Sequence, residues 1–126
     1  MIRMFHKKID QEFHINATDQ TKLSEIIHPI HNSNDPTTPY SLAHAFLSPG
    51  KQSSPHSLIQ STETFIFIQG TGEITIEKEK ESIQPGSIIV VPPGKYQFIH
   101  NTGSNNLEFY CIVSPPWDKN QDIPLK

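Results

Sequence analysis

The residues of this chain best suited to chemistry are His56, Glu63 and Gln97, which lie in two glycine-bounded stretches, 50–70 and 86–101. An imidazole nitrogen and a carboxylate oxygen form a mixed donor set that suits manganese, iron, nickel or zinc. A carboxylate that interrupts an apolar strand, as Glu63 does, is costly to bury without a cation, whereas at a rim it would be solvated. The first expectation is therefore a divalent metal site formed by His56, Glu63 and Gln97.

Other side chains are candidates for a further ligand or for the wall of a pocket around these three. His44 precedes the first stretch, and strand alternation leaves its direction open because Ala45 and Phe46 make both faces of its segment apolar. The remaining candidates for the wall are Phe65, Phe67, Ile99 and Tyr110. Such side chains either line a mostly apolar small-molecule pocket or simply fill a barrel. The histidines expected at the surface or in solvent are His6, His14, His28, His31 and His100.

The elements that position these residues are predicted to be strands. After Tyr40 the chain consists of short apolar segments separated by Gly, Pro and Asn, which is typical of an all-β sandwich or barrel. The predicted strands are 40–48, 55–60, 62–69, 72–78, 80–84, 87–91, 96–101 and 106–113. Before them, residues 21–28 are predicted to form a short helix capped by Thr21 and ended by Pro29, and residues 31–39 a loop.

Two of the predicted strands are apolar on both faces. In 62–69, Glu63 shares one face with two phenylalanines, while the other face carries Thr64 and two isoleucines. The segment 87–91 is likewise apolar on both faces. A sheet that is apolar on both sides needs cover on both sides, and a chain this short finds it in a second copy of itself. We therefore expect a homodimer.

Composition narrows the class of protein. A chain of 126 residues is expected to form one domain. Its net charge of -3, without a basic cluster, argues against a nucleic-acid partner. The single cysteine, Cys111, lies in an apolar run and is interpreted as a buried structural thiol. Neither a signal peptide nor a membrane span is apparent, so we expect a cytoplasmic protein that binds a small molecule and contacts no membrane.

The spacing of the two stretches resembles the two sequence motifs of the cupin family, most closely those of its small single-domain members. The motif positions are occupied, in order, by Gly50, His56, Leu58, Glu63, Gly70, Gly86, Pro92, Gly94, Gln97 and Asn101. The resemblance covers about residues 40–113 and implies an antiparallel jelly-roll β-barrel with the site inside, commonly dimeric. On this view residues 1–39 form an arm with a short helix, 40–117 the barrel and 118–126 a C-terminal tail.

The four metal ligands of the cupin pattern fall on His56, Leu58, Glu63 and Gln97. Leu58 cannot coordinate a metal, and Gln97 offers an amide oxygen in place of an imidazole. The triad of two histidines and one carboxylate that binds non-haem iron is therefore not reproduced. The metal site that the resemblance implies is weak or unusual.

Three hypotheses about function remain. The first is a metal-assisted enzyme of dioxygenase, isomerase or decarboxylase type that acts on a small oxygen-rich substrate. The second is a non-catalytic, metal-free barrel in which the same residues bind a small acid or sugar directly. The third is a purely structural dimeric barrel. The retained Glu63 favours the first hypothesis, and the missing ligand histidines favour the second.

Overall fold

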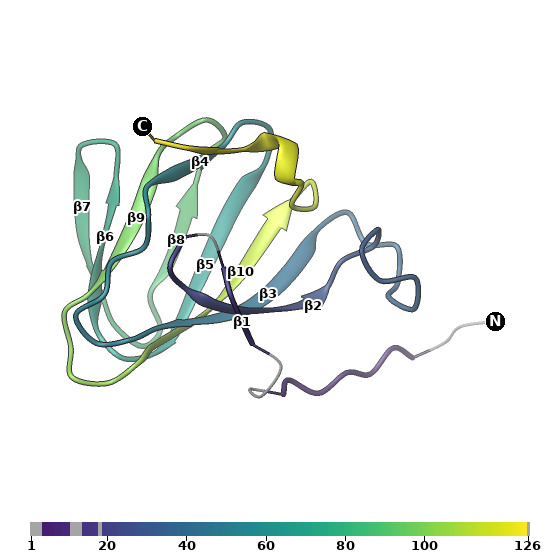
Figure 1. Ribbon diagram of the computed structural model, residues 1–126, viewed down its shortest axis with the longest axis horizontal. Helices are drawn as coiled ribbons and strands as arrows, with labels where there is room; N and C mark the ends of the chain where they lie inside the picture. The colour runs from purple at the N-terminus through teal and green to yellow at the C-terminus, as the bar shows by residue number, and fades with distance from the viewer. Residues whose placement is uncertain (1–3, 11–13, 18, 126) are drawn as a thin grey trace.

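The protein folds into two antiparallel β-sheets that face each other, as the computed structural model shows for residues 4–10, 14–17 and 19–125 (Figure 1). The first sheet has the strand order β1-β2-β3-β10-β5-β8, and the second has the order β11-β4-β9-β6-β7. The strands are β1 (Ile15–Asn16), β2 (Lys22–Ile27), β3 (Ser41–Leu47), β4 (His56–Leu58), β5 (Thr62–Gln69), β6 (Gly72–Ile76), β7 (Glu79–Ile83), β8 (Ile88–Val91), β9 (Gln97–Asn101), β10 (Leu107–Ser114) and β11 (Asp122–Pro124). The predicted all-β, antiparallel jelly-roll fold is confirmed.

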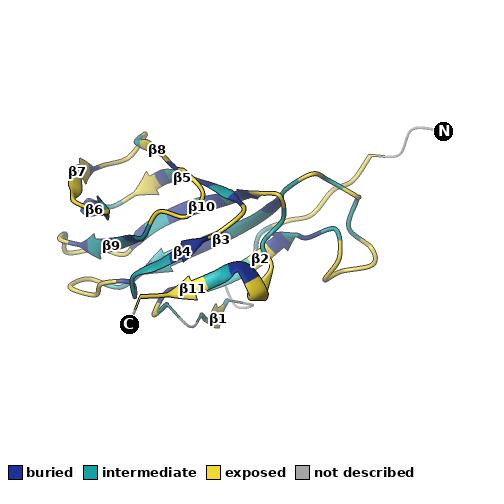
Figure 2. Cartoon of the chain, turned by 90° about the horizontal axis from the view of Figure 1, so that it is seen from above, coloured by how far each residue is buried: buried dark blue, intermediate teal, exposed yellow. Residues whose placement is uncertain are grey.

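The core lies between the two layers, where inward-facing residues of both sheets meet (Figure 2). Along β5 and β10 every second side chain is buried, as the period of two in a strand requires. Phe67 and Phe109 pack against each other with ring centroids 5.3 Å apart. Their fully buried neighbours are Leu47, Ile74, Ile83, Ile99 and Leu107. Within the described part of the chain, no helix is long and apolar enough to cross a membrane.

The eight strands predicted after Tyr40 all appear, as β3 to β10, with small differences at their ends. Their alternation and their Gly and Pro boundaries depend on neighbours in the sequence, which is why the pattern located them. β1 is a short strand within the N-terminal arm, and β11, at the other end of the chain, was not among the strands predicted. β11 pairs with β4, so residues 122–124 extend the five-stranded sheet instead of forming a tail.

The helix predicted for residues 21–28 is wrong, because this segment contains β2, which pairs antiparallel with β3. The error has an identifiable cause. The pairing runs from Lys22 to Glu25 in register, and then a β-bulge brings Ile26 and Ile27 opposite the single residue Leu42. The extra residue interrupts the alternation of inward and outward side chains along the strand. It leaves Leu23, Ile26 and Ile27 at the spacing expected for one face of a helix. No α-helix occurs among the described residues, and η2 (Lys119–Gln121) is one 3₁₀ turn.

The geometry of the two motif stretches comes from turns and a buried amide rather than from the site itself. The four glycines that bound the turns have φ between 76° and 95°. At Gly70 a Cβ would also lie 2.6 Å from the backbone oxygen of Asn106, so no side chain fits there. Asn101 is completely buried and donates to the carbonyls of Leu47 and Asn105 at 2.8 Å each. Gly50, Gly70, Gly86 and Asn101 hold loops at the end of the barrel where β3 and β5 end, and Gly94 lies at the opposite end, where its N–H donates to the carbonyl of Leu58.

Candidate functional site

A cavity of about 570 Å³ opens between the two sheets. Most of its wall is apolar and includes Leu23, Phe65, Ile99, Phe109 and Val113. Its polar wall includes Asp19, Ser53, His56, Glu63, Gln97 and Asp122. The inward face of β5 explains this division, because Glu63 and Phe65 line the cavity while Phe67, two residues further on, is fully buried in the core. A mostly apolar cavity with a few converging polar groups is the usual form of a small-molecule site.

The structure brings His56, Glu63 and Gln97 together on this polar wall. His56 on β4 and Gln97 on β9 are direct cross-strand partners, while Glu63 reaches them from β5 in the opposite sheet. The amide nitrogen Nε2 of Gln97 lies 2.9 Å from His56 Nε2 and 3.2 Å from Glu63 Oε1. One amide group therefore donates to both an imidazole and a carboxylate.

Two residues near the C-terminus orient the imidazole. His56 Nδ1 lies 2.7 Å from Asp122 Oδ1, and the indole Nε1 of Trp117 donates to Asp122 Oδ2 at 2.9 Å. With Nδ1–H donating to the carboxylate, His56 Nε2 carries the lone pair that accepts from Gln97. Trp117 lines the cavity and holds Asp122. The resulting chain Trp117–Asp122–His56 fixes which imidazole nitrogen faces the cavity.

Burial makes Glu63 an unusually weak acid. Its residue is 8% exposed, and desolvation raises the pKa of its carboxyl group to about 7. The positive charge that His56 can carry opposes this shift, whereas the carboxylates of Asp19 and Asp122 reinforce it. Burial likewise raises the pKa of the Cys111 thiol, which agrees with its interpretation as a buried thiol. Near neutral pH, Glu63 is poised between its acid and its carboxylate form.

The pKa of His56 is shifted upward despite its burial. Burial by itself disfavours the imidazolium, but the hydrogen bond to Asp122 and the nearby carboxylates of Glu63 and Asp19 outweigh it and raise the pKa. The nearest of these further oxygens, Asp19 Oδ2, lies 3.8 Å from His56 Nε2. For Asp122, burial favours the neutral acid, but the hydrogen bond from His56 and its charge hold the pKa below the ordinary value. The carboxylate of Asp122 thus favours the protonated form of His56, and the hydrogen bond from His56 favours the ionised form of Asp122.

The amide oxygen of Gln97 is the one buried side-chain nitrogen or oxygen, among the described residues, that has no hydrogen-bond partner. Gln97 is 3% exposed, so solvent does not satisfy this oxygen. Leaving a buried acceptor unpaired costs about 1–3 kcal/mol. In native structures such atoms are few, and their explanations include a bound water or ion and a functional role.

The other predicted pocket residues divide between the cavity and the rest of the barrel. Phe65 and Ile99 line the cavity, whereas Phe67 lies in the closed core. His44 and Tyr110, which are cross-strand partners, lie on the outer face of the six-stranded sheet and do not line the cavity. There, His44 Nε2 contacts Glu108 Oε1 at 2.6 Å and His44 Nδ1 contacts His14 Nε2 at 2.7 Å. His44 therefore fastens the arm around His14 to the sheet.

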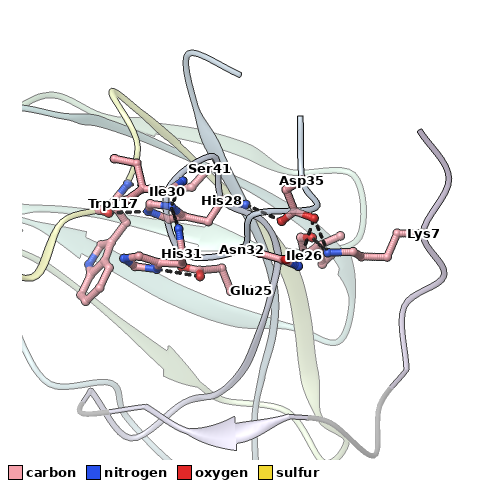
Figure 3. A network of polar contacts seen from close by, with 10 residues as sticks. All are labelled: Lys7, Glu25, Ile26, His28, Ile30, His31, Asn32, Asp35, Ser41 and Trp117. Carbon is pink, nitrogen blue, oxygen red and sulfur yellow. Dashed lines mark hydrogen bonds and ion pairs between the residues drawn. The ribbon is translucent and has the colours of Figure 1, made fainter. Parts of the chain in front are cut away.

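A second group with metal-ligand spacing lies at the cavity mouth, where ligand atoms of Glu25, His28 and His31 all lie within 4.8 Å of one another (Figure 3). Its histidines stack at 3.5 Å, and His31 Nδ1 lies 2.8 Å from Glu25 Oε1. His28 Nε2 contacts the carbonyl of Trp117 at 2.7 Å, and His28 Nδ1 accepts from the backbone N–H groups of Ile30 and His31. Both nitrogens of His28 are thus occupied by the protein itself. The prediction that His28 is solvated is wrong, since this residue is 1% exposed.

Sequence reasoning missed Asp19 and Asp122, which contribute charge to the polar wall. Neither belongs to a recognisable motif. Asp19 is placed by the turn before β2, where its Oδ1 accepts from the backbone and the hydroxyl of Thr21. Asp122 is placed by the pairing of β11 with β4, which sets it opposite Leu58. The one sequence signal for β11 is Pro124, because the residue before a proline favours an extended conformation.

Comparison with known proteins agrees with this architecture. A family model described as a cupin domain matches residues 43–113, which is more than half of the chain. An uncharacterized protein of Methanocaldococcus jannaschii is 29% identical over 100 residues, which cover 79% of this chain and 77% of that protein.

Solved structures share the fold at low sequence identity. A protein of Photorhabdus luminescens superposes with a TM-score of 0.76 at 24% identity, covering 94% of this chain and 92% of that one. A predicted oxalate decarboxylase from Thermotoga maritima superposes with a TM-score of 0.64 at 21% identity, covering 75% and 80%. At these identities the two structures establish a shared fold, and the activity in the second name belongs to that protein.

Proposed function

We propose that this chain, which belongs to the cupin family, binds a small molecule inside its barrel with the polar part of the ligand against His56, Glu63 and Gln97. The unpartnered Oε1 of Gln97 carries this proposal, because it is a buried acceptor on the wall of a cavity large enough for a ligand. The apolar wall would bury the rest of the molecule against Phe65 and Ile99.

The same three residues fit a divalent ion of manganese, iron, nickel or zinc. Gln97 Oε1 is unpaired, Glu63 supplies a carboxylate, and His56 turns Nε2 toward them while Nδ1 binds Asp122. A carboxylate behind the other ring nitrogen is the usual support of a metal-ligating histidine. A bound ion would polarise an oxygen of the ligand. The catalytic form of the proposal is a dioxygenase, isomerase or decarboxylase reaction on a small oxygen-rich substrate.

A metal-free binding site is the second candidate function. One observation favours it: the Gln97 amide nitrogen already lies within hydrogen-bond distance of both His56 Nε2 and Glu63 Oε1, the atoms that an ion would use. In this arrangement the two atoms that would bind a metal ion are already hydrogen-bonded within the protein. The ligand would then bind Gln97 Oε1 and the carboxylates directly.

Metal analysis separates the two candidates. We expect the purified protein, dialysed against manganese, iron, nickel or zinc, to retain about one ion per chain. His56→Ala and Glu63→Gln should lose that ion, because each removes a donor from the polar wall. His31→Ala and Glu25→Gln are the matched controls, since they alter the mouth group without touching the polar wall.

Each alternative result has one meaning. If the wild-type protein retains no ion, the metal form of the proposal is wrong and the metal-free form stands. If the ion is lost in His31→Ala but kept in His56→Ala, the metal lies at the mouth group.

We also propose that two copies associate through the outer face of the six-stranded sheet. Cross-strand register places Ile88, Ile66 and Tyr110 in one row. The adjacent row contains Val90, Thr64 and Ile112. Ile88 is 63% and Val90 55% exposed, and the six residues named in these rows are uncharged. β8 is also an edge strand of its sheet.

A further inference from the structure

The described residues that line the cavity include more acidic than basic side chains. Four carboxyl groups, from Asp19, Glu25, Glu63 and Asp122, face only two imidazoles, from His31 and His56. No lysine or arginine lines the cavity within the described part of the chain. An acid-lined, low-dielectric cleft attracts cations and repels anions.

The carboxylates differ in how far the protein satisfies them. Asp122 accepts from both His56 and Trp117, and Glu25 pairs with His31 at the mouth. Glu63 accepts from Gln97 at 3.2 Å and has a hydrogen bond with Cys111, but neither partner carries a positive charge. The charged partner nearest to Asp19 and Glu63 is the single imidazole of His56, which already pairs with Asp122. Asp19 receives its two hydrogen bonds from Thr21 on Oδ1, so among the described residues its Oδ2 has only the distant contact of 3.8 Å to His56.

The unpaired Oε1 of Gln97 points to a ligand independently of these charges. It is a neutral acceptor, and the amide nitrogen beside it is already used by His56 and Glu63. When no metal ion is bound, only a group that brings N–H or O–H donors can satisfy this oxygen. The charged and the neutral acceptors of the polar wall therefore require the same property of the ligand.

We infer that the natural ligand is an organic cation, a protonated amine on an apolar body, whose N–H groups bind Gln97 Oε1 and the carboxylates of Asp19 and Glu63. This inference rests on the proposed function and names its ligand class. The ammonium head would supply several donors to a wall made of acceptors, and the apolar body would pack on Phe65 and Ile99. A carboxylate or phosphate ligand would instead meet like charge without a lysine or arginine to bind it.

Three probes of similar size and shape but different charge test whether the cavity prefers a cationic, a neutral or an anionic ligand. They are 3-phenylpropylamine, 3-phenylpropanol and 3-phenylpropanoate, added to EDTA-treated protein near neutral pH. Trp117 is the single tryptophan and lines the cavity, so its fluorescence reports binding there, and calorimetry gives the affinity. We expect the amine to bind at least about tenfold more tightly than the carboxylate, as one charge-assisted contact would produce.

Variants assign that preference to the residues named. Asp19→Asn and Glu63→Gln should each weaken amine binding about tenfold and leave alcohol binding nearly unchanged. Retained alcohol binding also verifies that each variant is folded. Glu73→Gln is the control, because Glu73 lies on β6 and does not line the cavity.

The outcomes separate this inference from the proposal on which it rests. If the carboxylate binds as tightly as the amine, the inference is wrong although small-molecule binding in the barrel stands. If the amine does not bind at millimolar concentration, the inference is also wrong, and metal retention then decides the proposed function. An amine preference that survives both Asp19→Asn and Glu63→Gln would equally overturn it.

Discussion

At the scale of single residues, the chemistry of the site depends on the two ends of one amide. The nitrogen of Gln97 faces His56 and Glu63, and its oxygen has no partner. This orientation suits a neutral imidazole and an ionised carboxylate, because both then accept hydrogen bonds. If both groups were protonated, both would donate, and the opposite orientation of the amide would suit them better.

Glu63 makes stability depend on pH in a predictable direction. The folded protein keeps the Glu63 proton up to about pH 7, whereas the ordinary pKa of the group is 4.5. Wild-type protein therefore loses stability as the pH rises between these values, by up to about 3 kcal/mol. Glu63→Gln cannot ionise, so its free energy of unfolding in urea should fall much less between pH 5 and pH 8 in EDTA.

The remaining pH dependence of that variant has the same sign. The raised pKa of His56 provides stability below its ordinary pKa of 6.5, which is lost as the pH rises through the folded value. Glu73→Gln, on the outside of the barrel, should behave like wild type. If Glu63→Gln and wild type showed the same pH dependence, the pKa of Glu63 in the folded protein would be the ordinary value and not a raised one.

At the scale of elements, the residues of the site come from the three strands β4, β5 and β9 and from β11 near the C-terminus. β4 and β9 provide His56 and Gln97 as cross-strand partners, and β5 provides Glu63 from the other sheet. β11 adds Asp122 by pairing with β4. Leu125 N–H donates to the carbonyl of Pro55, which holds the end of the chain beside β4. The last strand is therefore part of the site and of the sheet.

Replacing the carboxylate of Asp122 by a neutral amide should show what β11 contributes to the site. In Asp122→Asn the pKa of His56 should fall, because burial is then opposed by fewer negative charges, and NMR titration of the imidazole measures it. The free energy of unfolding should fall by about 1–2 kcal/mol. Deletion of residues 122–126 should lower it further, because β4 loses its partner strand.

Asp118→Asn is the matched control for these measurements. Asp118 lies four residues earlier, is exposed and accepts from the N–H of Asn120. It should leave the titration of His56 unchanged. An unaltered pKa in Asp122→Asn would show that the contact with Asp122 does not govern the charge of His56.

At the scale of the whole molecule, the two faces of the six-stranded sheet have different roles. The inner face carries the core and the cavity, and the outer face carries the two apolar rows that we assign to a second copy. Specific interfaces bury about 800 Å² on each partner, so association through this face would involve most of its strands.

A charge in the apolar rows of that face should separate the copies. Val90→Glu would place a charged side chain from each copy in the proposed interface, and we expect the mass measured by light scattering to change from dimer to monomer. Ile30→Glu is the control, because Ile30 is also exposed but lies in the loop between β2 and β3, away from the two apolar rows. A wild-type protein that is monomeric at about 100 μM would contradict the proposed dimer.

The sequence by itself determined the strands after Tyr40, the family and the three central residues His56, Glu63 and Gln97. Alternation, turn glycines and motif spacing are local properties, so they can be recognised without the fold. Tertiary structure decided what no local pattern contains. The bulge in β2 turned a helical spacing into a strand, the register of β3 placed His44 outside the barrel, and strand pairing at the ends of the chain determined the placement of Asp19 and Asp122. These outcomes depend on contacts between segments far apart in sequence, and so does the burial that makes Glu63 a weak acid and leaves Gln97 Oε1 unpaired.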